Sequence, residues 1–320
     1  MQEISVTDIE NIRIGNAQDF AGGTGCTVIL CERGAPTGVD VRGGAPASRE
    51  TDLLNPVATV ERIHAVLLSG GSAFGLDAAA GVMEYLEKKN VGFDTGIAKV
   101  PIVCQSCLFD LVVGSASARP DKVMGYQACV DSESNRPQEG NVGAGTGATV
   151  GKYHGINYMM KSGLGIYAVQ LGELKLAAIV AVNALGDVFD PETGEVIAGM
   201  LNSDLTGFAN TEQVMYSQYS NKKDLFTGNT TIGVIVTNGK FNKVQATKIA
   251  AMAQNGYAKA IFPVHTTADG DSIYAISVGD VEADINVVGT LAAKVMAKAV
   301  ARAVLQAEPA YGLKSARDFL

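Results

Sequence analysis

The sequence predicts an α/β fold, in which helices pack against β-sheets. Apolar residues make up 47% of the 320 positions, so the chain can bury a large core as one large domain or two ordinary ones. Short apolar runs typical of buried strands alternate with segments whose apolar residues recur at helical spacing. The 37 glycines and the absence of tryptophan indicate many tight turns and close backbone approaches.

The first half of the chain predicts two strands, one helix and an irregular loop. Cys26 to Cys31 and Ala65 to Leu68 are short apolar runs, typical of buried strands. Ser72 to Lys89 carries apolar residues near one helical face, and Ser72 is the expected N-cap. A hydrolase elbow at Ser72 is disfavoured because Phe74 stands where the second glycine belongs. Ala118 to Gly151 predicts a loop-rich region, which contains the polar segment Asp131 to Gly140.

The middle of the chain predicts a pair of strands followed by a long loop. Gly163 to Leu171 and Leu176 to Val182 are expected to be neighbouring strands, and the second is apolar on both faces, as in the centre of a sheet. Gly194 to Gly228 is polar and weakly patterned, which predicts an exposed loop leading to the Asn229-Thr230 step.

The pattern is sharpest after Thr230. Thr231 to Thr237 and Ile273 to Val278 are predicted strands, and Phe241 to Asn255 and Ile285 to Gln306 are predicted helices. This alternation indicates layers of helices and strands, but it does not determine the order of the strands.

Charge and composition exclude several kinds of partner. The net charge of -8 disfavours nucleic acid and anionic membranes. Even the apolar run Leu174 to Leu185 is shorter than the roughly 18 to 20 residues of a membrane span. Five cysteines, an odd number, follow a start Met-Gln-Glu without a basic and apolar leader, so we expect a cytoplasmic protein with no nucleic-acid or membrane partner.

The short segment Gly228 to Ile232 is the main candidate for chemistry. It joins the polar stretch to an apolar strand, and a threonine whose own α-amine is freed by cleavage carries its base on the same residue. Asn229-Thr230 is therefore the candidate cleavage site. Asp269 and Asp271 lie ahead of the next strand, and their spacing alone fits either a turn or two positioned carboxylates.

Two other motifs are interpreted as structural. Cys104 and Cys107 form a CxxC pair, but the three histidines are scattered and no second pair follows, so no metal site is expected. The segment Gly145 to Lys152 resembles a phosphate loop only in outline, because Thr146 and Tyr153 replace the required glycine and hydroxyl residue. No nucleotide or other cofactor is expected.

Several motifs taken together resemble one family, the self-processing L-aminopeptidase/D-esterases and β-peptidyl aminopeptidases, and most closely the nylon-oligomer hydrolases. The likeness runs in order from about Gly23 to Ala299. The motifs are Asp40 to Gly44, Ser69 to Leu76, Gly143 to Gly147, Gly228 to Ile232, and His265-Thr266 followed by Asp269-Gly270-Asp271.

The resemblance implies a four-layer αββα sandwich of the N-terminal-nucleophile type. It implies one domain over residues 1–320, cut autocatalytically into a long chain, 1–229, and a short chain, 230–320. It also implies an amide hydrolase that acts on small peptide or amide substrates without a cofactor and assembles as a homo-oligomer, a tetramer or larger.

The resemblance also assigns roles residue by residue. Thr230 would be the cleaving nucleophile and then the catalytic residue, with its α-amine as base. Asp269 and Asp271 would orient that amine and hydroxyl. The charge of Lys152 would favour the ionised hydroxyl or the carboxylates, and the side-chain amide of Asn183 would donate to the tetrahedral oxyanion.

One position departs from the family pattern. Phe109 precedes Asp110-Leu111 where relatives commonly carry tyrosine, so a hydroxyl is missing beside the expected substrate pocket, in which we also place Thr231. Loss of one oxyanion donor can cost roughly 3 to 4 kcal/mol. A non-catalytic binding protein on the same fold therefore stays open as an alternative. A second alternative is an acyltransferase of the ornithine acetyltransferase kind, because water and amines compete for the same acyl-enzyme.

Overall fold

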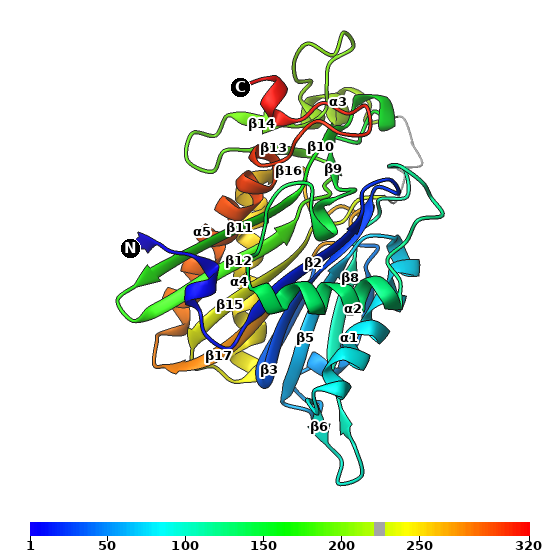
Figure 1. Ribbon diagram of the computed structural model, residues 1–320. Coiled ribbons are helices and arrows are strands. Elements are labelled where there is room, and N and C mark those ends of the chain that lie inside the picture. Colours follow the sequence, from blue (N-terminus) through cyan, green and yellow to red (C-terminus); the bar gives the residue numbers. More distant parts are fainter. Residues whose placement is uncertain (221–227) are drawn as a thin grey trace.

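The computed structural model describes residues 1–220 and 228–320. Helices cover the outer faces of its long strands (Figure 1). The strands of the main sheet are β1 (Gln2–Glu3), β2 (Arg13–Asp19), β3 (Thr24–Val41), β4 (Ala47–Arg49), β5 (Arg62–Ser69), β8 (Val103–Cys107), β11 (Leu164–Leu171), β12 (Leu174–Ala181), β15 (Ile232–Gly239) and β17 (Ser272–Val281). The helices are α1 (Ala78–Lys88), α2 (Lys122–Asp131), α3 (Thr211–Ser217), α4 (Lys243–Ala260) and α5 (Ile285–Leu305).

The main sheet runs in the order β1-β11-β12-β15-β17-β3-β5-β8-β4, and β2 also pairs with β3. Two short pairs of strands lie outside it: β6 (Phe93–Asp94) with β7 (Lys99–Val100), and β9 (Thr149–Val150) with β10 (Met160–Lys161). A small third sheet joins β13 (Asp187–Phe189) to both β14 (Val196–Ala198) and β16 (Ile261–Phe262).

The long strand β3 divides the main sheet into two halves. Its first part pairs with β2 and β5, and its last part, from Thr37 to Val41, pairs with β17. The register of the β3–β5 pairing shifts between Leu30 and Ala35, as it does at a β-bulge, where a strand bends. Two packed sheets result. The first sheet is built on β11, β12, β15 and β17, and the second sheet is built on β2, β5 and β8.

Alternation along each strand separates three cores. Along β12, Ala177 and Ile179 face the second sheet, whereas Leu176 and Ala178 face α4 and α5. On the other side of the second sheet, α1 and α2 pack on apolar residues of β3 and β5. The layers are therefore helices, sheet, sheet and helices (Figure 1), which confirms the predicted αββα sandwich.

The predicted strands and the two late helices are confirmed, but the strand predicted from Cys26 to Cys31 covers only part of β3, which continues to Val41. The prediction that Ser72 is an N-cap is wrong. A 3₁₀ helix, Ser72–Asp77, comes first, its N-cap is Gly71 without a side-chain bond, and Ser72 itself has φ of 53°. Tertiary contacts impose this turn, because Asp110 Oδ1 accepts the Gly71 N–H at 2.7 Å and Leu108 O accepts the Ser72 N–H at 2.9 Å.

Two predicted loops contain more structure than their composition indicates. The loop-rich region predicted from Ala118 to Gly151 holds α2, which begins at an Asp121 cap. The predicted exposed loop from Gly194 to Gly228 is wrong in part, because it holds β14 and α3 and buries Met200 and Leu201; residues 221–227 lie outside the described residues. The buried carboxylate of Asp187 organises this region by accepting the N–H groups of Met200 and Thr211, each at 2.8 Å.

Across residues 1–220 and 228–320, every helix is too short or too polar to cross a lipid bilayer.

Candidate active site

Three neighbouring strands bring the predicted site residues together where the strands begin or end, on one side of the first sheet. β12 runs antiparallel to β15, with Ala181 opposite Ile232, and β15 runs parallel to β17, with Ile232 opposite Ser272. The end of β12 and the starts of β15 and β17 therefore coincide. This register places Asn183, Thr230 and Asp271 close together, although they are far apart in sequence.

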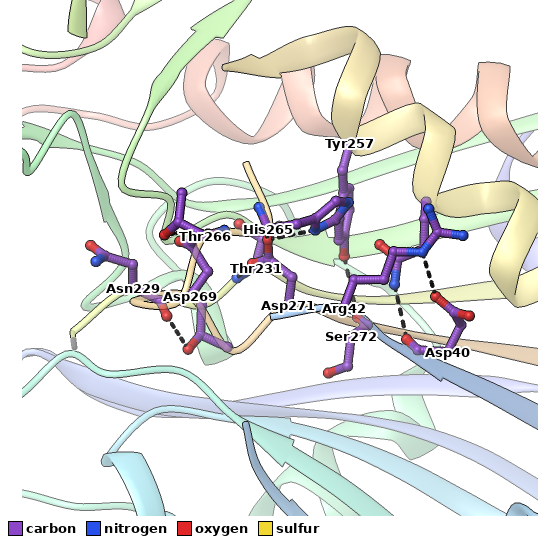
Figure 2. Close-up of polar contacts among 12 residues, drawn as sticks. Asp40, Arg42, Asn229, Thr231, Tyr257, His265, Thr266, Asp269, Asp271 and Ser272 are labelled. Atoms are coloured by element: carbon purple, nitrogen blue, oxygen red, sulfur yellow. Dashed lines mark hydrogen bonds and ion pairs between the residues drawn. The ribbon is translucent and has the colours of Figure 1, made fainter. Parts of the chain in front are cut away.

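The Asn229-Thr230 peptide bond is buried and held on both sides. Thr230 is 5% exposed, and its N–H donates to Asn183 O at 2.8 Å. Thr230 Oγ1 donates to the carbonyl oxygen of Asn229, which also accepts the backbone N–H of Gly270 at 2.9 Å. Asn229 and Asp269 form an isolated parallel bridge, and Figure 2 shows them side by side. The hydroxyl therefore lies against the carbonyl that it would attack.

Asp271 uses both carboxylate oxygens. Oδ1 accepts the N–H of Thr231 at 2.7 Å, and Oδ2 accepts the backbone N–H of His265 at 3.1 Å and contacts its Nδ1 at 2.9 Å (Figure 2). The sequence reasoning gave His265 no role, although it lies inside the recognised motif. Its position shortly before the two aspartates was the available signal.

Asp269 is held by Thr266, which lies in the loop between His265 and Asp271. Its Oδ2 accepts the N–H of Thr266 at 2.9 Å and the Thr266 hydroxyl at 2.5 Å. Burial raises the pKa of Asp269 to about 6, and the charge of Asp271 adds to this, whereas the Thr266 hydrogen bonds and Lys152 oppose it. These bonds go to Thr266 rather than to Thr230, so Asp269 positions the loop in the intact chain.

Lys152 and Asn183 form a second polar cluster beside the bond. Lys152 Nζ donates to Asn183 Oδ1 at 2.8 Å and to the carbonyl oxygens of Asn183 and Gly228, each at 3.0 Å. Burial lowers the pKa of Lys152 to about 7, against the charges of Asp269, Asp110 and Asp271. An amine with this pKa changes charge near neutral pH.

The side chain of Asn183 also points toward the segment before the cleavage site. Its Nδ2 donates to Phe109 O at 3.0 Å and to Gly228 O at 3.3 Å, while its Oδ1 accepts the Thr149 N–H at 3.1 Å. Phe109 thus reaches the site, through its main chain. Thr231 is buried, and its hydroxyl has no hydrogen-bond partner among the described residues.

Asp110 is a buried acid that the sequence reasoning did not select. Its Oδ2 accepts the Thr24 hydroxyl at 2.6 Å, and burial raises its pKa to about 6. A Cβ at Gly70 would lie 1.9 Å from Oδ2, and one at Gly147 would lie 2.6 Å from the Asp110 Cβ. Two of the glycine motifs therefore pack around this carboxylate. A third packs against the loop that carries Asp271, since a Cβ at Gly43 would lie 2.3 Å from the Asp271 nitrogen.

The CxxC pair lies in the interior. All five cysteines are free and buried. Cys104 belongs to the core between the sheets, and burial raises the pKa of Cys107 to about 12. These side chains are structural thiols. Within the described part of the chain, no group of three or more His, Cys, Asp or Glu side chains could hold a metal ion.

The fold is that of the N-terminal-nucleophile hydrolases. The L-aminopeptidase D-Ala-esterase/amidase from Ochrobactrum anthropi, described as a variant of that fold, superimposes with a TM-score of 0.70 at 16% identity over 95% of this chain and 86% of that chain. A β-aminopeptidase from Burkholderia sp. gives a TM-score of 0.65 at 16% identity, with the same coverage of 95% and 86%.

Sequence comparison gives the family. The chain belongs to peptidase family S58, whose model matches residues 5–317, and it is therefore a hydrolase. It is 36% identical over 344 residues to an uncharacterized aminopeptidase from Mycobacterium tuberculosis, covering 98% of this chain and 97% of the relative. It is also 31% identical over 278 residues to a 6-aminohexanoate-oligomer endohydrolase from Paenarthrobacter ureafaciens, covering 86% and 75%.

Proposed function

We propose that the protein is a self-processing amide hydrolase whose nucleophile is Thr230, released as a new N-terminus by cleavage of the Asn229-Thr230 bond. The observation that carries this proposal is the buried Thr230 hydroxyl, which lies against the carbonyl of the residue before it. Cleavage would separate a long chain, 1–229, from a short chain, 230–320.

Self-cleavage proceeds by an acyl shift. Thr230 Oγ1 attacks the carbonyl carbon of Asn229, a C–O bond forms, the C–N bond breaks, and the hydroxyl proton ends on the departing Thr230 nitrogen. Water then hydrolyses the ester, which leaves a carboxylate on Asn229 and restores the hydroxyl. The α-amine produced this way is the base for later turnovers.

Turnover uses the same hydroxyl on a substrate amide. The free amine of Thr230 accepts its proton, Asn183 Nδ2 donates to the tetrahedral oxyanion, and an acyl-enzyme forms and is hydrolysed. Lys152 favours the ionised hydroxyl through its charge, while Asp269 and Asp271 orient the amine. Burial of Thr230 and both acids supports these roles, because electrostatic interactions are stronger away from water.

The substrates we propose are small peptides or amides, cut as an aminopeptidase or amidase does, and oligoamides of the kind named for the relatives. Phe109 contributes its apolar ring, without a hydroxyl, to the substrate pocket.

We further propose that the protein is cytoplasmic and assembles as a homo-oligomer, a tetramer or larger. Light scattering after size-exclusion chromatography would test the size of the assembly.

The decisive test is the mass of the purified protein. Wild type should give two fragments, one ending at Asn229 and one starting at Thr230, and it should hydrolyse members of a panel of aminoacyl, β-aminoacyl and aminohexanoyl amides. Thr230→Ala should stay whole and inactive. A Thr230→Ala protein that still cleaves itself would assign the nucleophile to another residue, with Thr231 as the next candidate. An intact, inactive wild type would favour a non-catalytic binding protein.

A separate assay tests the acyltransferase alternative. An amine acceptor added to the reaction would reveal acyl transfer through its acylated product.

A further inference from the structure

The two carbonyl oxygens before Thr230 are held by different donors. Asn229 O, on the bond to be cut, accepts the N–H of Gly270 at 2.9 Å. Gly228 O, one residue earlier, accepts Lys152 Nζ at 3.0 Å and Asn183 Nδ2 at 3.3 Å. The side chain proposed as the oxyanion donor for substrates therefore binds the carbonyl next to the scissile one.

We infer that this protein has two oxyanion sites, used in succession. The backbone N–H of Gly270 stabilises the oxyanion of self-cleavage. The Lys152–Asn183 pair is filled by the Gly228 carbonyl in the intact chain and serves substrates only after cleavage. This inference rests on the proposed function, because it assumes that Thr230 attacks Asn229.

The peptide unit between Asp269 and Gly270 is fixed before the reaction. Its N–H meets Asn229 O at 2.9 Å, within the range of effective oxyanion donors, and its carbonyl oxygen accepts the Ala45 N–H at 2.8 Å. Bonds at both ends hold the peptide plane, so the donor needs no reorganisation when charge develops on Asn229 O. Hydrogen bonds in series also strengthen one another.

Only glycine permits this approach. A Cβ at position 270 would lie 2.6 Å from Thr230 Oγ1 and 2.8 Å from Ala45 O. Contacts this short are below any that a real Cβ makes, so a side chain would push the nucleophile or the donor away. Glycine at the centre of the Asp-Gly-Asp motif is thus required by the close approach of Thr230 Oγ1 and Ala45 O.

Cleavage changes the second site. Once the bond is cut, Gly228 is one residue from a free chain end, and its carbonyl can withdraw from Lys152 and Asn183. Each donor then loses one acceptor, and an unpaired buried donor costs about 1 to 3 kcal/mol. A vacated pair of donors, one of them basic, favours a ligand with a carbonyl oxygen, such as the amide of a substrate.

The first test removes one hydrogen-bond donor without adding a side chain. Glycolic acid incorporated in place of Gly270 replaces the N–H with an ester oxygen. Self-cleavage, followed by intact mass after cell-free synthesis, should slow about 100- to 1000-fold. Glycolic acid in place of Gly172, an exposed glycine in the β11–β12 turn, should leave the rate unchanged. Wild-type cleavage with the ester at 270 would overturn the inference.

The second test separates the two steps. Asn183→Ala should lower amide turnover by the cleaved protein about 100- to 1000-fold, and it should slow self-cleavage far less, because the Gly270 N–H still faces Asn229 O. A folded Asn183→Ala protein that stays whole, or that turns over normally, would refute the division. Thr230→Ala tests the proposed function separately, since a Thr230→Ala protein that cleaves itself would refute that proposal instead.

Discussion

The backbone N–H of Thr231 donates to Oδ1 of Asp271 over 2.7 Å, so the acid holds the residue after the proposed nucleophile rather than the hydroxyl itself. The other oxygen of Asp271 is held by His265, through its backbone N–H and Nδ1. Hydrogen bonds thus connect the His265 imidazole, through the Asp271 carboxylate, to the main chain of Thr231 at the start of β15.

Asp271→Ala should slow self-cleavage at least about 100-fold and lower the free energy of unfolding by about 2 to 3 kcal/mol, because buried N–H groups of Thr231 and His265 lose their acceptor. His265→Asn, which keeps a donor near the position of Nδ1, should cleave faster than His265→Ala. Cleavage time courses and urea unfolding measure both effects. Equal rates for the two His265 variants would show that the Nδ1 contact is unimportant.

Gly270→Ala should impair both stability and processing, because its Cβ would lie 2.6 Å from Thr230 Oγ1. We expect a loss of about 1 to 3 kcal/mol in the free energy of unfolding and little self-cleavage. The matched control is Gly207→Ala, whose Cβ would come no closer than 3.4 Å to Asn202 Nδ2. Urea unfolding and intact mass compare the two, and equal behaviour would contradict the predicted crowding.

Lys161 predicts a pH dependence of stability. Its fully buried Nζ donates to the carbonyl oxygens of Gly145, Ala148 and Ser162, and burial lowers its pKa from 10.5 to about 7. Between these values the unfolded chain binds more protons than the folded one, so the free energy of unfolding should rise as the pH rises.

Lys161→Met should remove up to about 1.4 kcal/mol per pH unit from that slope. Urea unfolding between about pH 7.5 and 9.5 measures it. Lys152 carries a similar shift and should supply much of the slope that remains. An unchanged slope in the variant would mean that Lys161 is not the group responsible.

The cysteines should be unreactive in the folded protein. All five are buried and free, and burial raises the pKa of Cys31, Cys107 and Cys129 to about 12. Because the thiolate is the reactive form, a thiol reagent at about pH 8 should titrate almost none of them until the chain is unfolded, when all five should react. Rapid reaction of a native thiol would place it at an accessible surface.

Local patterning was sufficient for the strands β11, β12, β15 and β17 and for the helices α4 and α5. β12 and β15 are apolar on both faces because each lies between a helical layer and a second sheet, and the apolar stripes of α4 and α5 face the sheet to which β12 and β15 belong. The helix α2 and the strand β14 were missed because their residues show no clear period; α2 is fixed by a cap at Asp121, and β14 is followed by residues bound to the distant Asp187.

The sequence by itself determined which residue types stand at the candidate site, and the resemblance selected Thr230, Asp269, Asp271, Lys152 and Asn183 from them. Tertiary structure alone decided how they meet, since strand register aligns the end of β12 with the starts of β15 and β17. The folded chain also brings His265, Asp110 and the Gly270 N–H to the candidate site. A backbone donor carries no signal in residue type, so only the folded chain shows which amide faces the scissile carbonyl.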